Sequence, residues 1–388
     1  MSAQGLAFAM TLVFSVAPAL GATPAARLRP LPQADGWRAA GLAGARGLTI
    51  GPIENAYHPG VGYGSRAYDR TLLESARIGA GWIAITPFGR VASLEGRGVD
   101  LTFEAPFRQN RESVRRAIEM AHARGLKVML VPHLWVESGE WRALIDPKTD
   151  EGWARWAASY RAFVRTWAQL AELTGTEMFS AGVELRSWVT TTRAPSFSEI
   201  VRDIRGVYHG ILTYSANWDD VDQTVILGDL DVIGINAFYP LAEKDGASEA
   251  ELRKGGERVR SKVHDLAETW HRPVLFTEIG YTTRSDPAVH PWEWPDKMTD
   301  VHVDEYAQAV AYHALLAPVL DEPYFAGFFV WRVYSDPEDV SQEAEWGFSP
   351  RGKLAELVVR DAFHAAWAGD GERAMGWAPR AREPGIFP

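Results

Sequence analysis

The chain has 388 residues, of which 46% are hydrophobic and 23% charged, a composition typical of a globular protein with a large core. Its formal net charge of −10 argues against a nucleic-acid partner, because phosphate binding needs a basic surface. It contains no cysteine, which excludes thiol catalysis and thiolate metal sites.

The N-terminal residues 1–22 form an apolar stretch followed by small residues, which is the pattern of an export signal. A membrane anchor is the alternative, but Pro18 interrupts the apolar stretch, which is shorter than the roughly 20 residues of a spanning helix. We therefore expect an exported protein, periplasmic or secreted, with no membrane span after signal removal. Residues 23–46 are rich in Pro and Ala and predict a lead-in segment.

Apolar runs of strand length recur along the rest of the chain. They predict eight strands: GLTIG (47–51), WIAITPF (82–88), KVMLVPHLW (127–135), MFSAGVEL (178–185), GILTYSA (210–216), DVIGINAFY (231–239), PVLFTEIGY (273–281) and AGFFVWRV (326–333).

Helical patterns fill most of the intervals between these runs. Residues 153–170 carry a wide apolar stripe at helical spacing, which indicates a helix that packs on a sheet. Ser196 with Glu199 and Ser248 with Glu251 match the capping box that begins a helix. The interval after the fifth strand is short enough to hold only a turn.

Strands that are apolar on both faces and separated by helices indicate a parallel sheet covered by helices. Eight such units favour an α/β fold closed into a (β/α)8 TIM barrel over residues 47–366. A doubly wound open sheet is the alternative, since it has the same repeated unit. Residues 367–388 are rich in Gly, Pro and Arg and predict a loose tail.

Two glutamates end predicted strands, Glu184 the fourth and Glu278 the seventh. In a TIM barrel the carboxyl ends of the strands form the active face, so both side chains are expected in one pocket. Glycosidic bond cleavage needs two such groups, an acid for the leaving oxygen and a carboxylate that attacks the sugar carbon or activates water. A single glutamate at a strand end is more often a helix cap or a salt-bridge partner. Two such glutamates, each preceded by apolar or small residues, are harder to explain in this way.

Aromatic and polar residues follow the same strand ends. Sugar rings stack on aromatic side chains, and a pocket for hydroxyl groups needs polar neighbours. Core packing is the alternative for each aromatic residue, and an ordinary structural role is the alternative for each polar one. The predicted substrate-binding residues are His133, Trp135, Trp188, Asn217, Trp218, Asn236, Tyr281 and Trp331, with Arg90 and Arg332 as further polar residues at this face.

Other chemistries have weaker support. The chain has no Gly-x-Ser-x-Gly motif and no His-Glu-x-x-His pair or comparable ligand cluster. The glycine-rich residues 59–65 have no following Lys-Ser/Thr and predict a flexible loop. We expect neither a metal nor a cofactor.

Several short motifs resemble a known family. They are GVELRS (182–187), TYSANWD (213–219), DVIGINAFYPL (231–241), FTEIGY (276–281) and WGFSPRGK (346–353). In this order they resemble glycoside hydrolase family 113, whose known members are largely β-mannanases, within the larger clan of retaining glycosidases. They also resemble the related barrel domains of gene transfer agents.

The resemblance implies that Glu184 is the acid/base, that Glu278 is the nucleophile and that Tyr239 orients Glu278 by a hydrogen bond. It also implies that Trp331 lies under the sugar next to the scissile bond. Many clan members have Asn before the acid/base, where this chain has Val183, so the contact with the sugar 2-hydroxyl differs.

The expected function is therefore a retaining glycoside hydrolase that acts on a β-linked polysaccharide or oligosaccharide, with mannan the first substrate to test. Two alternatives remain open. One is a non-catalytic carbohydrate-binding or envelope protein on the same barrel, since fold does not dictate function. The other is a transglycosylase, which passes the sugar to a hydroxyl group other than water.

Overall fold

The computed structural model describes residues 44–51, 60–103, 105–320, 322–338, 343–365 and 367. The expected export signal, nearly all of the lead-in segment and the tail beyond Trp367 lie outside these residues. Among the described residues, no helix combines the length and the apolar character that crossing a membrane requires.

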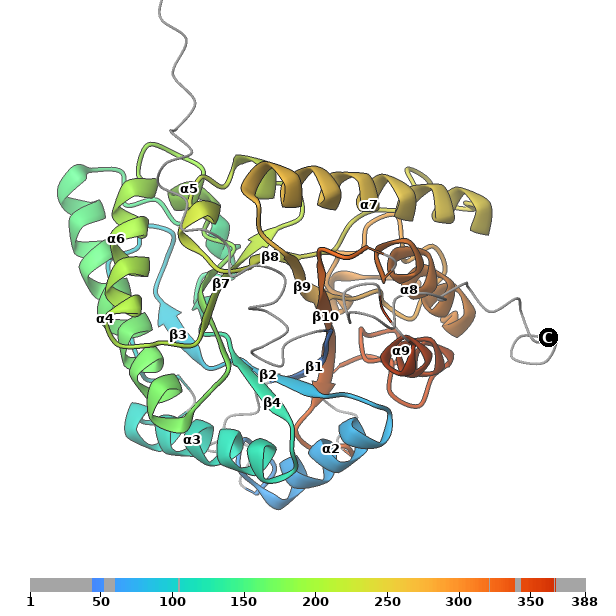
Figure 1. Ribbon diagram of the computed structural model, residues 1–388, viewed down its shortest axis with the longest axis horizontal. Coiled ribbons are helices and arrows are strands. Elements are labelled where there is room, and N and C mark those ends of the chain that lie inside the picture. Colours follow the sequence, from blue (N-terminus) through green and yellow to red (C-terminus); the bar gives the residue numbers. More distant parts are fainter. Residues whose placement is uncertain are drawn as a thin grey trace, which may run out of the picture. The chain divides into compact units, whose positions relative to one another are not determined.

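Eight parallel strands close into a barrel, as the sequence predicts (Figure 1). Around the barrel the order is β1, β10, β9, β8, β7, β6, β4 and β2, and β2 pairs with β1 to complete the ring. The strands are β1 (Ala45–Gly51), β2 (Trp82–Ile85), β4 (Lys127–Leu130), β6 (Met178–Val183), β7 (Ile211–Asn217), β8 (Ile233–Asn236), β9 (Val274–Ile279) and β10 (Phe325–Tyr334).

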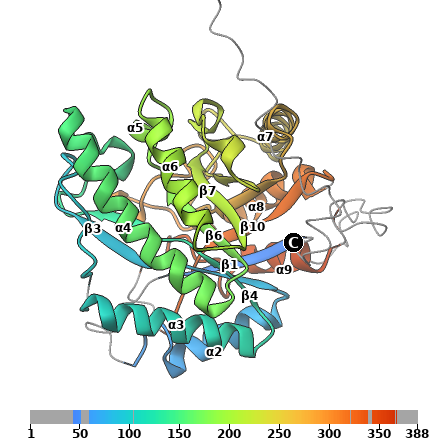
Figure 2. The same ribbon diagram turned by 60° about the vertical axis from the view of Figure 1, so that its left-hand side comes forward.

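Helices surround the strands (Figure 1), and the turned view places α4 and α6 side by side over one flank (Figure 2). They are α2 (Arg66–Arg77), α3 (Phe107–Ala123), α4 (Asp150–Thr174), α5 (Arg186–Val189), α6 (Ala194–Arg205), α7 (Glu249–Trp270), α8 (Glu305–Leu320) and α9 (Leu354–His364). Short 3-10 turns occur at η2 (Arg142–Leu144), η3 (Val221–Gln223), η4 (Leu227–Asp229) and η5 (Pro295–Lys297). Only the turns η3 and η4 lie between β7 and β8, as predicted for this interval.

Side chains alternate along each strand between the barrel interior and the helices. In β2, Trp82 and Ala84 belong to a compact cluster inside the barrel, whereas Ile83 belongs to the larger cluster that includes the helices. The apolar stripe predicted over 153–170 lies within α4, which Thr149 caps by accepting from the Gly152 N–H over 3.0 Å. Both strand faces are thus buried, which explains the nearly continuous apolar runs in the sequence.

Two of the predicted strands are shorter than expected because proline interrupts them. The chain leaves the barrel after β2 and β4, at Pro87 and Pro132, and continues as β3 (Phe88–Val91) and β5 (His133–Val136). These two pair with each other in a separate parallel sheet. Proline has no N–H to donate to a sheet, so the break occurs where the sequence places it.

One of the two predicted capping boxes is confirmed. Ser248 caps α7 and exchanges hydrogen bonds with Glu251. The prediction for Ser196 is wrong: α6 begins two residues earlier, at Ala194, with Pro195 in its first turn. The Ser196 hydroxyl instead donates to the Arg193 carbonyl over 2.8 Å.

Trp367, assigned to the tail from the sequence, is buried and stacks on Phe328 of β10 with 5.6 Å between ring centroids. Trp367 also contacts Arg46 of β1, whose guanidinium carbon lies 4.0 Å from the ring centroid. Trp367 therefore covers the pairing of the first and last strands.

Candidate active site

The two glutamates predicted from the sequence lie at the carboxyl end of the barrel. Glu184 directly follows β6, and Glu278 is the last residue but one of β9. Both are nearly buried, with 7% and 6% of their surface exposed. Two carboxyl groups are therefore held at the active face, largely removed from bulk water.

Asn236, the last residue of β8, joins the two carboxyl groups. Its Nδ2 donates to Glu184 Oε1 over 2.9 Å, and its Cα pairs in register with that of Glu278 on the neighbouring strand β9. Its Oδ1 accepts from Thr277 Oγ1 over 2.9 Å, which fixes the direction of the amide. After burial, the charge of Glu184 is the largest influence that raises the pKa of Glu278. Glu184 and Glu278 are therefore neighbours at the active face, on either side of Asn236.

Glu184 has a backbone φ of 52°, a left-handed conformation that few residues other than glycine adopt. Its N–H still donates to Ser215 O of β7 over 2.9 Å, so the residue stays tied to the barrel while the chain turns. Backbone strain of this kind persists only where the surroundings fix it. At Glu184 the side-chain contacts supply that constraint.

Two residues of the loop after β5 hold the other carboxyl oxygen of Glu184. Trp141 Nε1 donates to Glu184 Oε2 over 2.8 Å, and Arg142 Nη2 lies 3.2 Å from the same oxygen. Neither residue was predicted from the sequence, because both lie outside any predicted strand end. Their adjacency in a segment that follows a strand was the only available signal.

Glu278 lies beside His133, the first residue of β5, with 3.5 Å between Oε1 and the imidazole Nε2. Burial first, and then the nearby Arg142 and Arg332, hold the pKa of His133 well below its usual value. The imidazole is therefore neutral near pH 7. As a neutral group, it cannot stabilise an ionised Glu278 as a charged partner would.

The pKa of Glu278 is raised well above its usual value, mainly by burial and then by the charge of Glu184. Arg142, Arg332 and the hydrogen bond from Asn236 act in the opposite direction but are weaker. Glu278 therefore ionises at a higher pH than an exposed glutamate does, although a nucleophile must be ionised.

Trp331 lies beside these groups, near the end of β10. Its ring stacks on His133 with 6.0 Å between centroids, and it packs with Phe238 and Phe348. The guanidinium carbon of Arg332 lies 5.1 Å from the same ring. The predicted placement of Trp331 next to the carboxyl pair is consistent with these contacts.

Trp135 and Trp292 also expose wide apolar faces. Trp135 in β5 is 47% exposed and borders Phe88. Trp218 is less accessible than predicted, because Trp292 of the long loop after β9 stacks on it with 5.2 Å between centroids. Trp292 is itself 47% exposed, so it presents the face that was expected of Trp218.

Two predicted substrate-binding residues are wrong. Trp188 is buried in α5, packs on Trp153 of α4 and donates from Nε1 to Ser196 Oγ. Tyr281 is also buried and packs edge-on against Tyr312 of α8. Both side chains point into the layer between barrel and helices, so neither faces the carboxyl pair.

The hydrogen bond expected between Tyr239 and Glu278 is absent. The buried Tyr239 hydroxyl has no hydrogen-bond partner in the described part of the chain, and its ring packs on Trp218. Asn217 is near the site, but its amide donates to Asp219 Oδ1 over 2.6 Å. Among the predicted polar residues, His133 and Asn236 are the ones that contact the glutamates.

A family model matches this architecture over residues 62–353, a span that includes both glutamates and about three quarters of the chain. This chain belongs to glycoside hydrolase family 113.

Solved structures of family 113 enzymes share the fold. The β-mannanase of Alicyclobacillus acidocaldarius, solved with ManMIm, has 25% identity and a TM-score of 0.71, with 84% of this chain and 98% of that chain covered. A second family 113 β-1,4-mannanase has 21% identity and a TM-score of 0.70, with 83% and 99% covered. A family 5 protein of Streptomyces cattleya, solved with Manβ1-4GlcNAc, has 16% identity and a TM-score of 0.55, with 82% and 79% covered.

A search of the curated proteins finds no match to this sequence. The family 113 assignment therefore comes from the family model, and the solved mannanases agree with it in fold. As a member of this family the chain is a glycoside hydrolase, and its substrate is a carbohydrate.

Proposed function

We propose that this chain is a retaining glycoside hydrolase that cleaves β-1,4-linked mannan, with Glu184 as acid/base and Glu278 as nucleophile. The observation that carries the proposal is that both carboxyl groups adjoin Asn236, which donates to Glu184 and pairs in register with Glu278. Retaining enzymes hold their two carboxyl groups about 5 Å apart, whereas inverting enzymes separate them further to admit water. The similarity to family 113 β-mannanases supports mannan as the substrate.

The reaction has two steps. In the first, Glu278 attacks the anomeric carbon and forms an ester with it, while the bond to the leaving oxygen breaks and Glu184 donates its proton to that oxygen. In the second, Glu184 takes a proton from water, the water oxygen bonds the anomeric carbon, and the ester to Glu278 breaks. The second step restores both glutamates, and configuration at the carbon is retained.

The first step requires an ionised Glu278 and a protonated Glu184. The reactive form of the pair therefore carries a single proton, on Glu184. Arg332 favours this form, because it lowers the pKa of Glu278. Because the pKa of Glu278 is raised, the ionisation of Glu278 limits activity on the acidic side of the pH profile.

Trapping with a 2-deoxy-2-fluoro-β-mannoside tests the assignment. The fluorine slows both steps, and a reactive leaving group allows only the first, so the sugar should accumulate on the nucleophile. Mass spectrometry of peptides should find it on Glu278. An adduct on Glu184 would reverse the two roles.

Substitutions give an independent measure. Glu184→Gln and Glu278→Gln should each lower kcat/KM on mannan by on the order of 10³-fold. Glu137→Gln, at the exposed ion pair with Arg90, is the matched control and should keep activity. Full activity of Glu278→Gln would reject the proposal, as would a first-formed α-anomer in a proton NMR time course.

A further inference from the structure

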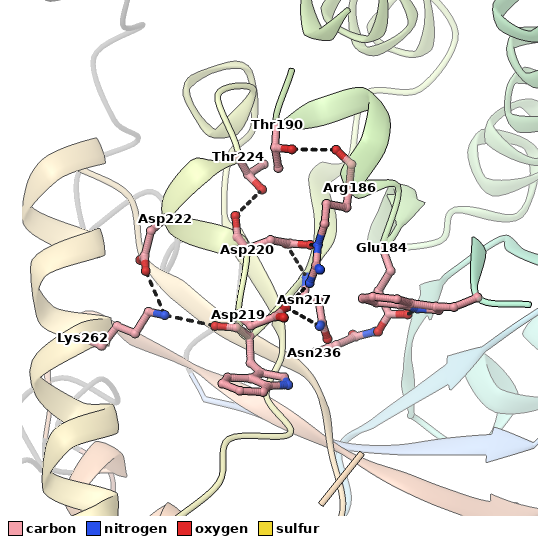
Figure 3. A network of polar contacts seen from close by, with 12 residues as sticks. Glu184, Arg186, Thr190, Asn217, Asp219, Asp220, Asp222, Thr224, Asn236 and Lys262 are labelled. Carbon is pink, nitrogen blue, oxygen red and sulfur yellow. Dashed lines mark hydrogen bonds and ion pairs between the residues drawn. The ribbon is translucent and has the colours of Figure 1, made fainter. Parts of the chain in front are cut away.

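A polar network begins two residues after Glu184, beside Glu184 and Asn236 (Figure 3). Arg186, the first residue of α5, donates from Nε to Asp220 Oδ2 over 2.7 Å and pairs through Nη2 with Asp219. Asp220 is almost fully buried, whereas Asp219 is partly exposed. The network thus connects the start of α5 to the segment that follows β7.

The end of β7 fixes both aspartates. The Asn217 N–H donates to Asp220 Oδ1 over 3.1 Å, and Asn217 Nδ2 donates to Asp219 Oδ1 over 2.6 Å. Each carboxylate therefore has a fixed donor besides the guanidinium, and a guanidinium shared between two held carboxylates has little freedom to turn. The position of Arg186 is set by the barrel itself.

Arg186 in turn contacts the loop that reaches Glu184. Its guanidinium carbon lies 4.7 Å from the ring centroid of Trp141, and the Trp141 indole donates to Glu184 Oε2 over 2.8 Å. The neighbouring Ser187 hydroxyl donates to the Ile145 carbonyl, which ties the same loop to α5. Contacts thus run without a gap from Asp220 through Arg186 and Trp141 to Glu184.

The indole hydrogen bond depends on this support. An N–H donor in a ring points correctly only when the ring plane is fixed, and the attraction between the guanidinium and the aromatic face supplies that constraint. Without Asp220, Arg186 keeps only the more exposed Asp219 as a partner. Its guanidinium can then turn toward solvent, and Trp141 loses the contact on that face.

We infer that Arg186 and Asp220 are positioning residues that hold Trp141 against Glu184 and so align this carboxyl with the departing oxygen of the substrate. The inference rests on the proposed acid/base role of Glu184. Neither residue contacts the reacting atoms, and their effect passes through Trp141.

The test compares substrates that differ in their need for an acid. Mannan needs a proton on its leaving oxygen, whereas 2,4-dinitrophenyl β-mannobioside releases a stable phenolate without one. In Asp220→Asn and Arg186→Met, kcat/KM on mannan should fall at least about tenfold, while kcat/KM on the aryl substrate should stay within about threefold of wild type. Trp141→Phe keeps the ring but removes the N–H donor, so it should show the same selective loss.

Asp231→Asn is the matched control. Asp231 pairs with Arg205 and accepts from the Leu212 N–H, but it precedes β8 and so lies at the opposite end of the barrel. This variant should leave both kcat/KM values unchanged. An equal loss on both substrates in Asp220→Asn and Arg186→Met, or no loss on either, would overturn the inference.

A second measurement does not depend on turnover. In ¹⁵N spectra of the tryptophan indoles, the Trp141 signal is identified by its absence in Trp141→Phe. It should shift and exchange faster with solvent in Asp220→Asn and Arg186→Met, but not in Asp231→Asn. An unmoved Trp141 signal would overturn the inference even if wild type cleaves no mannan, whereas an inactive wild type with a shifted signal would count against the proposed substrate alone.

Discussion

Asn236 brings a neutral donor to the point where the two carboxyl groups meet. Its amide lowers the pKa of Glu278 and bonds Glu184, and Thr277 fixes its orientation. A charged donor in its place would bind both carboxylates too strongly for either to be protonated, and an acid would add a third negative charge. An amide has the right hydrogen bonds without either effect.

The substitution Asn236→Asp tests whether a neutral side chain is needed at this position. A third carboxyl group should raise the pKa of Glu278 further, because a nearby like charge disfavours its ionised form. Since activity needs Glu278 ionised, the acidic limb of the kcat/KM profile should move to higher pH, so that the variant loses more activity at pH 5 than at pH 7. Asn110→Asp is the control, because Asn110 is also buried but bonds Ala105 in front of α3. A limb that stays in place or moves to lower pH would contradict the role of Asn236.

At the residue scale, the sequence predicts the position of a side chain correctly where its place along a strand is enough to determine it. Glu184 directly follows β6 and Glu278 is the last residue but one of β9, so the fold brings both to the active face. Trp188 and Tyr281 also follow strands, but each turns away from the active face, a direction that residue type does not encode. Trp141 and Arg142 could not be predicted, because a loop returns them to the site.

Helix α7 has two consecutive glycines at which other parts of the backbone approach it closely, and at one of them the neighbour is α8. A Cβ added at Gly256 would lie 1.9 Å from the Ala314 carbonyl oxygen, and one at Gly255 would lie 2.2 Å from the Leu241 carbonyl oxygen. Glycine in a helix interior normally costs stability relative to alanine. In α7 it is required because backbones, not side chains, approach the helix.

Gly256→Ala should therefore destabilise the protein although it raises helix propensity. The added methyl group would push α8 away, and overpacking of this kind costs about 2 kcal/mol. Thermal or urea unfolding measures the effect. Gly81→Ala is the control, since a Cβ there meets nothing within 4 Å, and it should be nearly neutral. A Gly256→Ala variant as stable as wild type would show that the helices can separate freely.

Elements were predicted well where the pattern is long and less well at their ends. All eight barrel strands and α4 were identified from apolar periodicity. The separate sheet of β3 and β5 was missed, because Pro87 and Pro132 lie within apolar runs that otherwise read as continuous. The proline signal was present in the sequence, but the apolar pattern outweighed it.

At the scale of the whole molecule, the burial of Glu278 lowers the stability of the folded protein when this residue is ionised, and the reaction needs the ionised form. Its pKa is raised in the folded state, so the folded protein binds this proton more tightly than the unfolded chain. The stability that Glu278 contributes is therefore present at low pH and lost as the pH rises from the usual glutamate value through the raised one. Above this pH range the Glu278 carboxylate is ionised although it is nearly buried, which lowers the free energy of unfolding.

Glu278→Gln should remove this cost. The neutral amide does not titrate, so the Tm of the variant relative to wild type should rise as the pH is increased from about 4.5 to 7. We expect the variant to be more stable than wild type at pH 7 while it is inactive. Tm curves that stay parallel over this range would show that Glu278 ionises in the folded protein as easily as in the unfolded chain.

The ring of strands closes between residues that are far apart in the chain. β10 must lie between β1 and β9, and its pairing with β1 joins residues separated by about 280 positions. During synthesis, β1 therefore leaves the ribosome long before β10 exists. The edge of β1 that will pair with β10 must stay free of other partners until then. Protein truncated before β10 would expose two unpaired edges at once, on β1 and β9, and is expected to aggregate.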